Sequence, residues 1–329
     1  MKLKTDRTLI AGIGAALIDL LLPESENFLK KTGVEKGGMR LVENNVIDTV
    51  LQQSKIKPTV VPGGSACNTI IGISKLGGRA RFIGKCGKDE YGSFFENDLR
   101  KNNVEPLLFK SSSPTGRVLS VVTPDAQRSL LTFLGASSET AADEISVTCF
   151  DAAAIVHIEG YLLFNKDLMM VALNYAKKSG ALISLDLASF TVVEQFKDII
   201  EEIIDNFVDI LIANEDEARA FTGCVEDLDA VKALAKKADI AVLKVGERGS
   251  WVASSGNITK IEPVGSERVV DTTGAGDLWA SGFLFGLLNG YPVEKCGKLA
   301  SACGYEVCRV MGADIPEKGW QTIKRIMEE

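Results

Sequence analysis

Short apolar runs alternate with amphipathic or glycine-bounded stretches along most of this chain, and this alternation constrains the fold more than any other feature. The runs with the length and composition of buried strands are residues 9–14, 81–84, 153–159, 182–187, 208–213 and 240–245. Strands that are joined through helices pair in parallel and have both faces covered. The sequence therefore predicts an α/β fold with a mostly parallel central sheet.

Two segments interrupt this alternation. Residues 19–62 are rich in polar and turn residues, and residues 105–137 contain two strand-like runs, 116–123 and 128–134, joined by a turn at 124–127. We expect a single domain over residues 1–329 with these two segments inserted into it as a small β structure.

Composition excludes several classes of protein. The 329 residues are 46% hydrophobic and 25% charged, with a net charge of −7 and no long Lys/Arg cluster, which disfavours a nucleic-acid partner. The apolar run near the start is interrupted by Asp19 with no cleavage site after it, and no run is long enough to span a membrane. We expect a cytoplasmic protein without a membrane partner.

The cysteines and the histidine exclude some chemistries as well. Seven cysteines form no Cys-x-x-Cys pair, which favours free thiols over structural zinc. His157 is the one histidine, so motifs with paired histidines cannot be written. It lies in an apolar run, and we interpret it as a packed strand residue rather than a catalytic base.

The run Asp271-Thr-Thr-Gly-Ala-Gly-Asp277 precedes an apolar stretch, 278–288, that predicts a buried helix. A glycine-rich turn into a helix start leaves backbone N–H groups free to bind an anion, here those of Ala275, Gly276 and Asp277. A carboxylate at the same point suits the removal of a proton from a group held beside that anion. The sequence thus predicts a phosphotransferase, with simple capping by Asp271 or Thr273 as the alternative.

Further polar residues follow the predicted strands. Ligands in open α/β sheets bind beyond the carboxyl ends of the strands, so these side chains can converge on one edge. Asp19 lies in an apolar run and needs a partner, either protein donors or the adjacent hydroxyls of a ribose. The candidates at this edge are Asp19, Gly63, Gly64, Asn68, Asn214, Glu217 and Asp277.

These motifs resemble the ribokinase-like (PfkB) family of carbohydrate and nucleoside kinases. The family's N-terminal signature reads Gly63-Gly-Ser-Ala-Cys-Asn68, followed by Gly77 and Gly87, and its Asn-x-x-Glu motif reads Asn214-Glu-Asp-Glu217. Ile70 and Trp279 depart from the usual residues, which bears on pocket shape. The resemblance implies a three-layer ribokinase-like sandwich with a small β lid, and the use of ATP and Mg²⁺.

The resemblance also implies roles for single residues. Asp277 is the expected base, and Gly274, Ala275 and Gly276 form the anion hole. Gly63, Gly64 and Asn68 are expected at the acceptor, Asp19 at a ribose diol, and Arg128 at the transferred phosphate. Lys244, Gly246 and Gly249 are expected on the ATP side, with Glu217 and Asn214 orienting Mg²⁺ through water. Asp271 and Thr273 match positions that bind a monovalent cation such as K⁺ in some relatives, and helix capping is equally open for them.

The sequence does not decide which molecule accepts the phosphate. The insertion at 28–39 resembles the adenosine-kinase branch, so adenosine is favoured, with guanosine, inosine, ribose and fructose as alternatives. A nicotinamide oxidoreductase is suggested by Gly12-Ile-Gly14, but the third glycine of that fingerprint would fall at Leu17. A non-catalytic nucleoside sensor is disfavoured by the intact Asp277 motif. The chain could act as a monomer or a homodimer.

Overall fold

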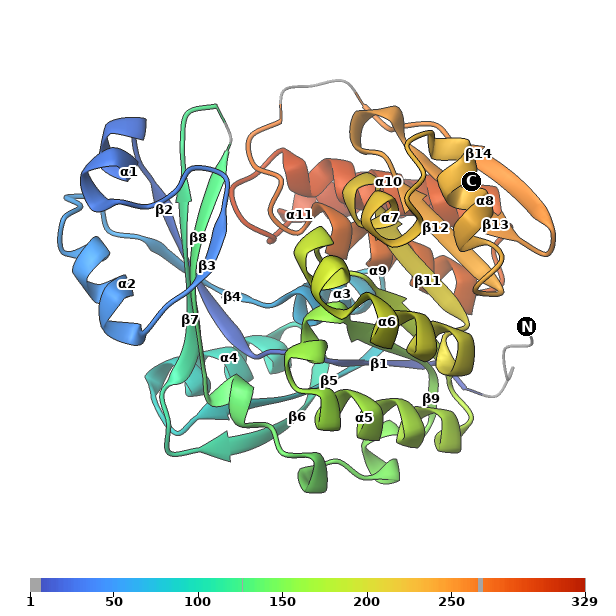
Figure 1. The fold of residues 1–329 in the computed structure, drawn as a ribbon, viewed down its shortest axis with the longest axis horizontal. Coiled ribbons are helices and arrows are strands. Elements are labelled where there is room, and N and C mark those ends of the chain that lie inside the picture. The colour runs from blue at the N-terminus through green and yellow to red at the C-terminus, as the bar shows by residue number, and fades with distance from the viewer. Residues whose placement is uncertain (1–6, 126, 266–268, 329) are drawn as a thin grey trace.

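A large, mostly parallel sheet forms the centre of the molecule (Figure 1). The computed structural model describes residues 7–125, 127–265 and 269–328, and within them this sheet has nine strands in the order β14-β13-β12-β11-β10-β9-β1-β5-β6. Two of the pairings among these strands are antiparallel, β12 with β13 and β13 with β14. The strands are β1 Leu9–Ile13, β5 Arg79–Gly87, β6 Val104–Ser111, β9 Ala153–Glu159, β10 Leu182–Asp186, β11 Ile210–Asn214, β12 Ile240–Lys244, β13 Ser250–Ser254 and β14 Asn257–Ile261.

Helices cover both faces of the large sheet, which makes a three-layer sandwich. The helices on one face are α5 Lys166–Ser179, α6 Phe190–Phe207, α7 Glu215–Thr222 and α8 Asp227–Leu234. Those on the other face are α3 Ser65–Lys75, α4 Glu90–Lys101, α9 Ala275–Leu288 and α10 Val293–Cys308, and α11 Glu317–Glu328 packs outside α10. The predicted α/β class is confirmed.

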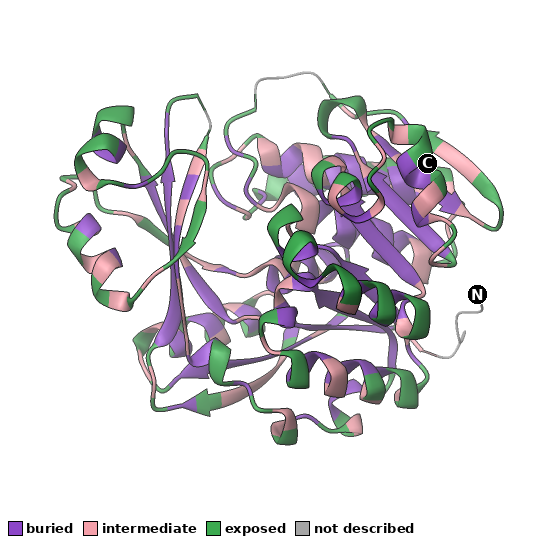
Figure 2. Ribbon diagram, in the orientation of Figure 1, coloured by how far each residue is buried: buried purple, intermediate pink, exposed green. Residues whose placement is uncertain are grey.

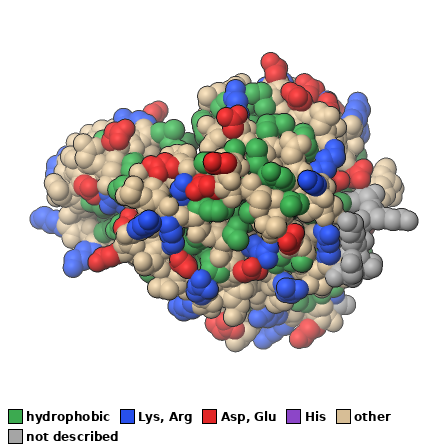
Figure 3. All heavy atoms as spheres, turned by 90° about the horizontal axis from the view of Figure 1, so that it is seen from below, with side chains coloured by type: hydrophobic (Ala, Val, Ile, Leu, Met, Phe, Trp, Pro, Cys, Tyr) green, Lys and Arg blue, Asp and Glu red, His purple; other side chains and the backbone are tan. Residues whose placement is uncertain are grey.

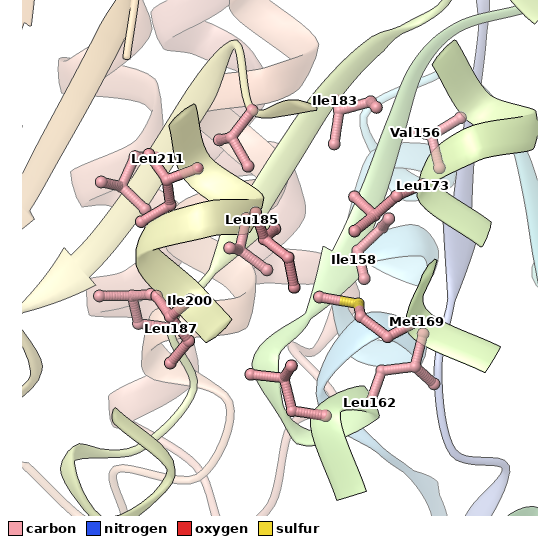
Figure 4. Close-up of a cluster of buried hydrophobic side chains, with 14 of the residues drawn as sticks. Val156, Ile158, Leu162, Met169, Leu173, Ile183, Leu185, Leu187, Ile200 and Leu211 are labelled. Carbon is pink, nitrogen blue, oxygen red and sulfur yellow. The ribbon is translucent and has the colours of Figure 1, made fainter. Parts of the chain in front are cut away.

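The central strands are mostly apolar because both of their faces are buried (Figure 2). On β9, Val156 and Ile158 pack against the α5 and α6 layer (Figure 4), whereas Ile155 points to the α3 and α9 layer. His157 shares that second face, is fully buried, and lies 3.1 Å through Nδ1 from Ser184 Oγ. Burial lowers its pKa to about 4, so it is a neutral, packed strand residue as expected.

A second, smaller sheet stands beside the first, at the left of Figure 1. In the described part of the chain it has five strands in the order β3-β8-β7-β2-β4. They are β2 Leu17–Pro23, β3 Met39–Leu41, β4 Thr59–Gly63, β7 Thr115–Val122 and β8 Arg128–Gly135, with α1 Glu26–Thr32 and α2 Asn44–Leu51 packed on them. The space-filling view in Figure 3 shows a notch beside this smaller lobe and acidic and basic side chains interspersed over the face.

The boundaries of the small sheet differ from the predicted insertions. Strand β6, residues 104–111, covers the start of the predicted segment 105–137, yet it extends the large sheet through parallel pairing with β5. The small sheet receives β7 and β8 from that segment, and residue 126 of the predicted turn lies outside the described residues. The sequence could not show which sheet each strand joins, because β6 and β7 are both short runs followed by turns.

Two further findings concern the whole described chain. None of the seven cysteines, all of which are described, forms a disulfide. Across the described ranges, no helix has the length and apolarity to cross a membrane.

Candidate active site

A cavity of about 510 Å³ lies where the carboxyl ends of the central strands meet the small sheet. Both sheets contribute to its lining, so the small sheet has the place of a lid over the ends of the strands. The predicted site residues that line it are Asp19, Gly64, Asn68, Arg128, Asn214, Glu217, Lys244, Thr273, Gly274, Ala275, Gly276 and Asp277. Four other predicted residues, Gly63, Gly246, Gly249 and Asp271, are not part of the lining.

Helix α9 begins at this cavity. Gly274 is its N-cap and adopts the left-handed conformation (φ 73°), which a glycine allows at little cost. The N–H of Ala275 donates to the carbonyl of Thr272 at 3.2 Å, whereas those of Gly276 and Asp277 have no partner among the described residues. Residues 278–286 of the helix are all buried, as predicted. The helix start therefore presents free donors to the cavity.

Asp277 is the third residue of α9 and is held from helix α3. Ser65 Oγ donates to its Oδ1 at 2.7 Å, and Asn68 Nδ2 donates to its Oδ2 at 2.8 Å. Burial raises the pKa of Asp277, and these two hydrogen bonds act in the opposite direction. Asn68, predicted at the acceptor, thus uses its amide nitrogen to orient Asp277. A carboxylate that is fixed in place and more basic than usual can accept a proton.

A row of polar side chains ends four adjacent strands beside α9. The last residues of β9, β10, β11 and β12 are Glu159, Asp186, Asn214 and Lys244. Lys244 Nζ lies 2.8 Å from Asp186 Oδ2, and a Cβ atom on Gly276 would lie 3.0 Å from that same Nζ. The ammonium group is therefore placed beside the free N–H groups of the helix start, where it adds positive charge.

Glu217 forms a capping box with Asn214 at the start of α7. Its Oε2 accepts from the Asn214 N–H at 2.8 Å, its Oε1 accepts from Asn214 Nδ2 at 2.7 Å, and Asn214 Oδ1 accepts from the Glu217 N–H at 2.9 Å. Burial, and then the charge of Asp186, raise the pKa of Glu217 to about 7. Carboxylate oxygens are the donors that Mg²⁺ prefers. The described residues include no cluster of three ligating side chains, and the orientation of Mg²⁺ by Glu217 through water stays a prediction.

Asp19 lies on β2 of the small sheet and faces the cavity. No described residue hydrogen-bonds or ion-pairs with its carboxylate, and that carboxylate lies against the Cα of Gly63, where any side chain would collide with it. Burial raises its pKa to about 7, although the charge of Arg128 acts against the rise. Gly63 thus makes room for the carboxylate of Asp19, and its predicted contact with the acceptor stays a prediction.

Arg128 joins the small sheet to the segment before α9. Its Nη1 donates to Thr273 Oγ1 at 3.2 Å, and its Nε lies 3.7 Å from Asp271 Oδ1. Asp271 is fully buried and also accepts from Thr273 Oγ1 at 2.7 Å and from the N–H of Gly312 at 2.8 Å. The alternative of simple helix capping by Asp271 or Thr273 is wrong, because the N-cap of α9 is Gly274 and no side chain accepts a hydrogen bond there. Asp271 instead binds Thr273 and Gly312 before the helix, and binding of K⁺ at Asp271 and Thr273 stays a prediction.

Gly246 and Gly249 lie in the turn between β12 and β13, away from the cavity lining. Both have positive φ (55° and 88°), and a side chain on Gly249 would collide with the Ile261 carbonyl. The shape of the turn accounts for both glycines, and their predicted contact with ATP remains untested.

Sequence reasoning missed three residues of the site: Ser65, Glu159 and Asp186. Ser65 belongs to the recognised signature but received no role. Glu159 and Asp186 fall in runs that were predicted as strands, and each ends its strand at the cavity. Both residues lie at the ends of predicted strands, and ligands in open α/β sheets bind at the carboxyl ends of strands, so this position is the sequence signal for Glu159 and Asp186.

Comparison with known proteins gives the family. A model of the pfkB family carbohydrate kinases matches residues 39–319. The chain belongs to the pfkB family. As a pfkB kinase it is a phosphotransferase with an alcohol group as acceptor, and the predicted ribokinase-like fold is confirmed. The family implies ATP as a substrate and typically Mg²⁺.

Individual relatives of this pfkB kinase differ in acceptor. Its fold matches adenosine kinase from Sinorhizobium meliloti with a TM-score of 0.90 at 30% identity, covering 97% of this chain and 99% of that one. It matches a probable sugar kinase from Rhizobium etli with a TM-score of 0.91 at 27% identity, covering 97% and 98%. Adenosine kinase 2 of Arabidopsis thaliana is 25% identical over 94% of this chain and 96% of its own length.

Proposed function

We propose that this pfkB kinase transfers the γ-phosphate of ATP to the primary hydroxyl of a nucleoside, with adenosine as the favoured acceptor. One observation carries the proposal. A single cavity contains Asp277 at a helix start with free N–H donors, and also a second carboxylate, Asp19, that no described protein group satisfies. Asp277 at the helix start is suited to phosphoryl transfer, and Asp19 is suited to accepting hydrogen bonds from a pair of hydroxyls.

Asp277 acts as the base in this proposal. A substrate hydroxyl has a pKa of about 16 and a carboxyl group one of about 4, so Asp277 cannot hold a free alkoxide before transfer. It accepts the proton as the loose transition state develops, and before that it aims the hydroxyl at the phosphate. Ser65 and Asn68 fix the carboxylate for that task. A base of this kind contributes about 10²- to 10⁴-fold in rate.

The phosphate end of the cavity is electropositive. The N–H groups of Gly276 and Asp277 and the ammonium of Lys244 face the position where charge develops on the transferred group. Arg128 reaches the same region from the lid. Bound Mg²⁺ would neutralise charge on the ATP phosphates, and Glu217 and Asp186 would hold its water shell.

Asp19 is the basis for preferring a nucleoside. A carboxylate can accept one hydrogen bond from each hydroxyl of a ribose diol, and a buried carboxylate without donors costs several kcal/mol. Relatives named adenosine kinase, in Sinorhizobium meliloti and Arabidopsis thaliana, support this choice. The second candidate is a sugar kinase, which the match to the Rhizobium etli protein favours.

A panel of acceptors tests the proposal. ATP consumption is measured with adenosine, inosine, guanosine, ribose and fructose, each with wild-type protein and with Asp277→Asn. The proposal predicts the highest kcat/KM with adenosine and loss of that activity in the variant. Turnover of fructose or ribose without turnover of any nucleoside would instead establish the sugar kinase.

A further inference from the structure

Glu159 is a buried carboxylate that the proposed chemistry does not use. It ends β9 and is 2% exposed. Its Oε1 accepts from the N–H of Ala15 at 2.9 Å, and its Oε2 accepts from the N–H of Ala66 at 2.8 Å. No cation pairs with it among the described residues. Two backbone donors from separate segments therefore satisfy this charge.

The start of helix α3 explains one of these hydrogen bonds. Its N-cap is Gly64, which has no side chain, so the first N–H groups lack the usual local acceptor. Glu159 supplies that acceptor from the neighbouring strand, and the helix dipole favours its negative charge there. Ala66 is the second residue of this helix.

Close packing fixes the carboxylate from the other side. A Cβ atom on Gly14 would lie 2.6 Å from Glu159 Oε2, so only glycine at position 14 admits the side chain. The carbonyl of Ala15 likewise occupies the space where a side chain on Gly64 would lie. The turn between β1 and β2 and the start of α3 therefore meet at Glu159.

These two segments position the residue proposed to bind the acceptor and the residue proposed to remove its proton. The turn at Ala15 leads directly into β2, which bears Asp19. The start of α3 bears Ser65 and Asn68, which hold Asp277. We propose that Glu159 is a positioning residue that keeps the acceptor-binding strand and the base in register with each other. This inference rests on the proposed roles of Asp19 and Asp277.

Glu159→Gln tests the inference, because the amide keeps the size of the side chain but can accept from only one of the two N–H groups. Small displacements of reacting groups are costly, so kcat should fall roughly 10- to 100-fold, and the KM of the acceptor should rise. The KM of ATP should stay unchanged, since within the described residues the hydrogen bonds of Glu159 go to Ala15 and Ala66, and neither reaches Lys244 or the start of α9. Hydrogen exchange at the amides of Ala15 and Ala66 should accelerate while the rest of the sheet stays protected.

Asp209→Ala is the control for the loss of a buried acceptor outside the site. Asp209 also accepts a backbone N–H, that of Ile183 at 2.8 Å, but it lies at the amino end of the sheet, away from the cavity. Because this variant leaves the Ile183 N–H without its acceptor, Asp209→Ala should lower the melting temperature without changing kcat or either KM. Gly14→Ala is a second variant, which displaces the carboxylate of Glu159 without removing its charge. It serves as the test if Glu159→Gln does not fold.

The outcomes separate this inference from the proposed function. The assay uses whichever acceptor the wild-type protein turns over, so an unexpected acceptor overturns the nucleoside assignment and leaves the comparison of variants intact. A folded Glu159→Gln or Gly14→Ala protein with wild-type kcat and acceptor KM would overturn the positioning role. A loss of stability alone, matching the loss in Asp209→Ala, would overturn it as well.

Discussion

Replacing Asp277 by asparagine removes the proposed base with little change in structure. Both groups that contact its carboxylate are donors in the native arrangement: Ser65 Oγ at 2.7 Å and Asn68 Nδ2 at 2.8 Å. An amide can direct its oxygen to Asn68 and its NH₂ to Ser65, because a hydroxyl can turn and accept. The variant should therefore fold and keep its acceptor in place.

The magnitude follows from the lost proton transfer. A positioned base is worth about 10²- to 10⁴-fold, which is about 2.7 to 5.4 kcal/mol of barrier. The kcat should fall by that factor while the KM of the acceptor changes little, since the amide retains the size and the contacts of the carboxylate. The free N–H donors of the helix start are untouched, so residual turnover above the uncatalysed rate is expected.

The assay is steady-state ATP consumption with the acceptor and ATP each varied at a saturating concentration of the other. Circular dichroism and thermal melting show that the variant is folded. A clean preparation of Asp277→Asn that keeps near-native kcat would refute the assignment of the base. A large rise in acceptor KM at constant kcat would instead give Asp277 a binding role.

Three further predictions concern single side chains. Ser65→Ala removes a donor that lowers the pKa of Asp277, so the acid limb of the kcat profile should move to higher pH; an unmoved limb would separate Ser65 from the base. Glu217→Gln should raise the Mg²⁺ concentration needed for half-maximal kcat without weakening acceptor binding in the absence of ATP, and an identical Mg²⁺ titration would leave Glu217 as a partner of Asn214 alone. The folded-state pKa of Asp19 is raised to about 7, whereas its unfolded pKa is about 4. The stabilisation that Asp19 provides is therefore fully present below about pH 4 and is lost as the pH rises through about 7. The free energy of unfolding, measured with urea, should show Asp19→Asn becoming more stable relative to wild type between those pH values, and a constant difference would contradict the raised pKa.

The sequence predicted those features that depend on local pattern. Strand β9 was predicted at its observed limits, 153–159, because a strand buried on both faces consists mostly of apolar residues. The start of α9 was predicted because glycine and aspartate have few other reasons to occur together before a buried helix. Asp19 was predicted because a lone acid in an apolar run needs a partner.

Features that depend on tertiary contacts were not predictable. The assignment of Asn68 to the acceptor missed its hydrogen bond to Asp277, which joins residues 209 positions apart. The assignment of β6 to the insertion failed because a strand gives no local sign of which sheet it extends. The role of Gly63 as the residue that makes room for Asp19 depends on antiparallel pairing of β2 with β4, which one sequence does not reveal.

In the proposed function, Asp19 binds the hydroxyl pair of a ribonucleoside whose primary hydroxyl faces Asp277. The most direct test compares kcat/KM for adenosine and 2′-deoxyadenosine in wild-type protein and in Asp19→Ala. A polar group left unpaired in a closed site is penalised, so the wild-type enzyme should prefer adenosine by roughly 10²-fold or more, and the variant should lose most of that preference. Equal efficiency of the wild-type enzyme on the two nucleosides, or a preference that survives in Asp19→Ala, would contradict the account.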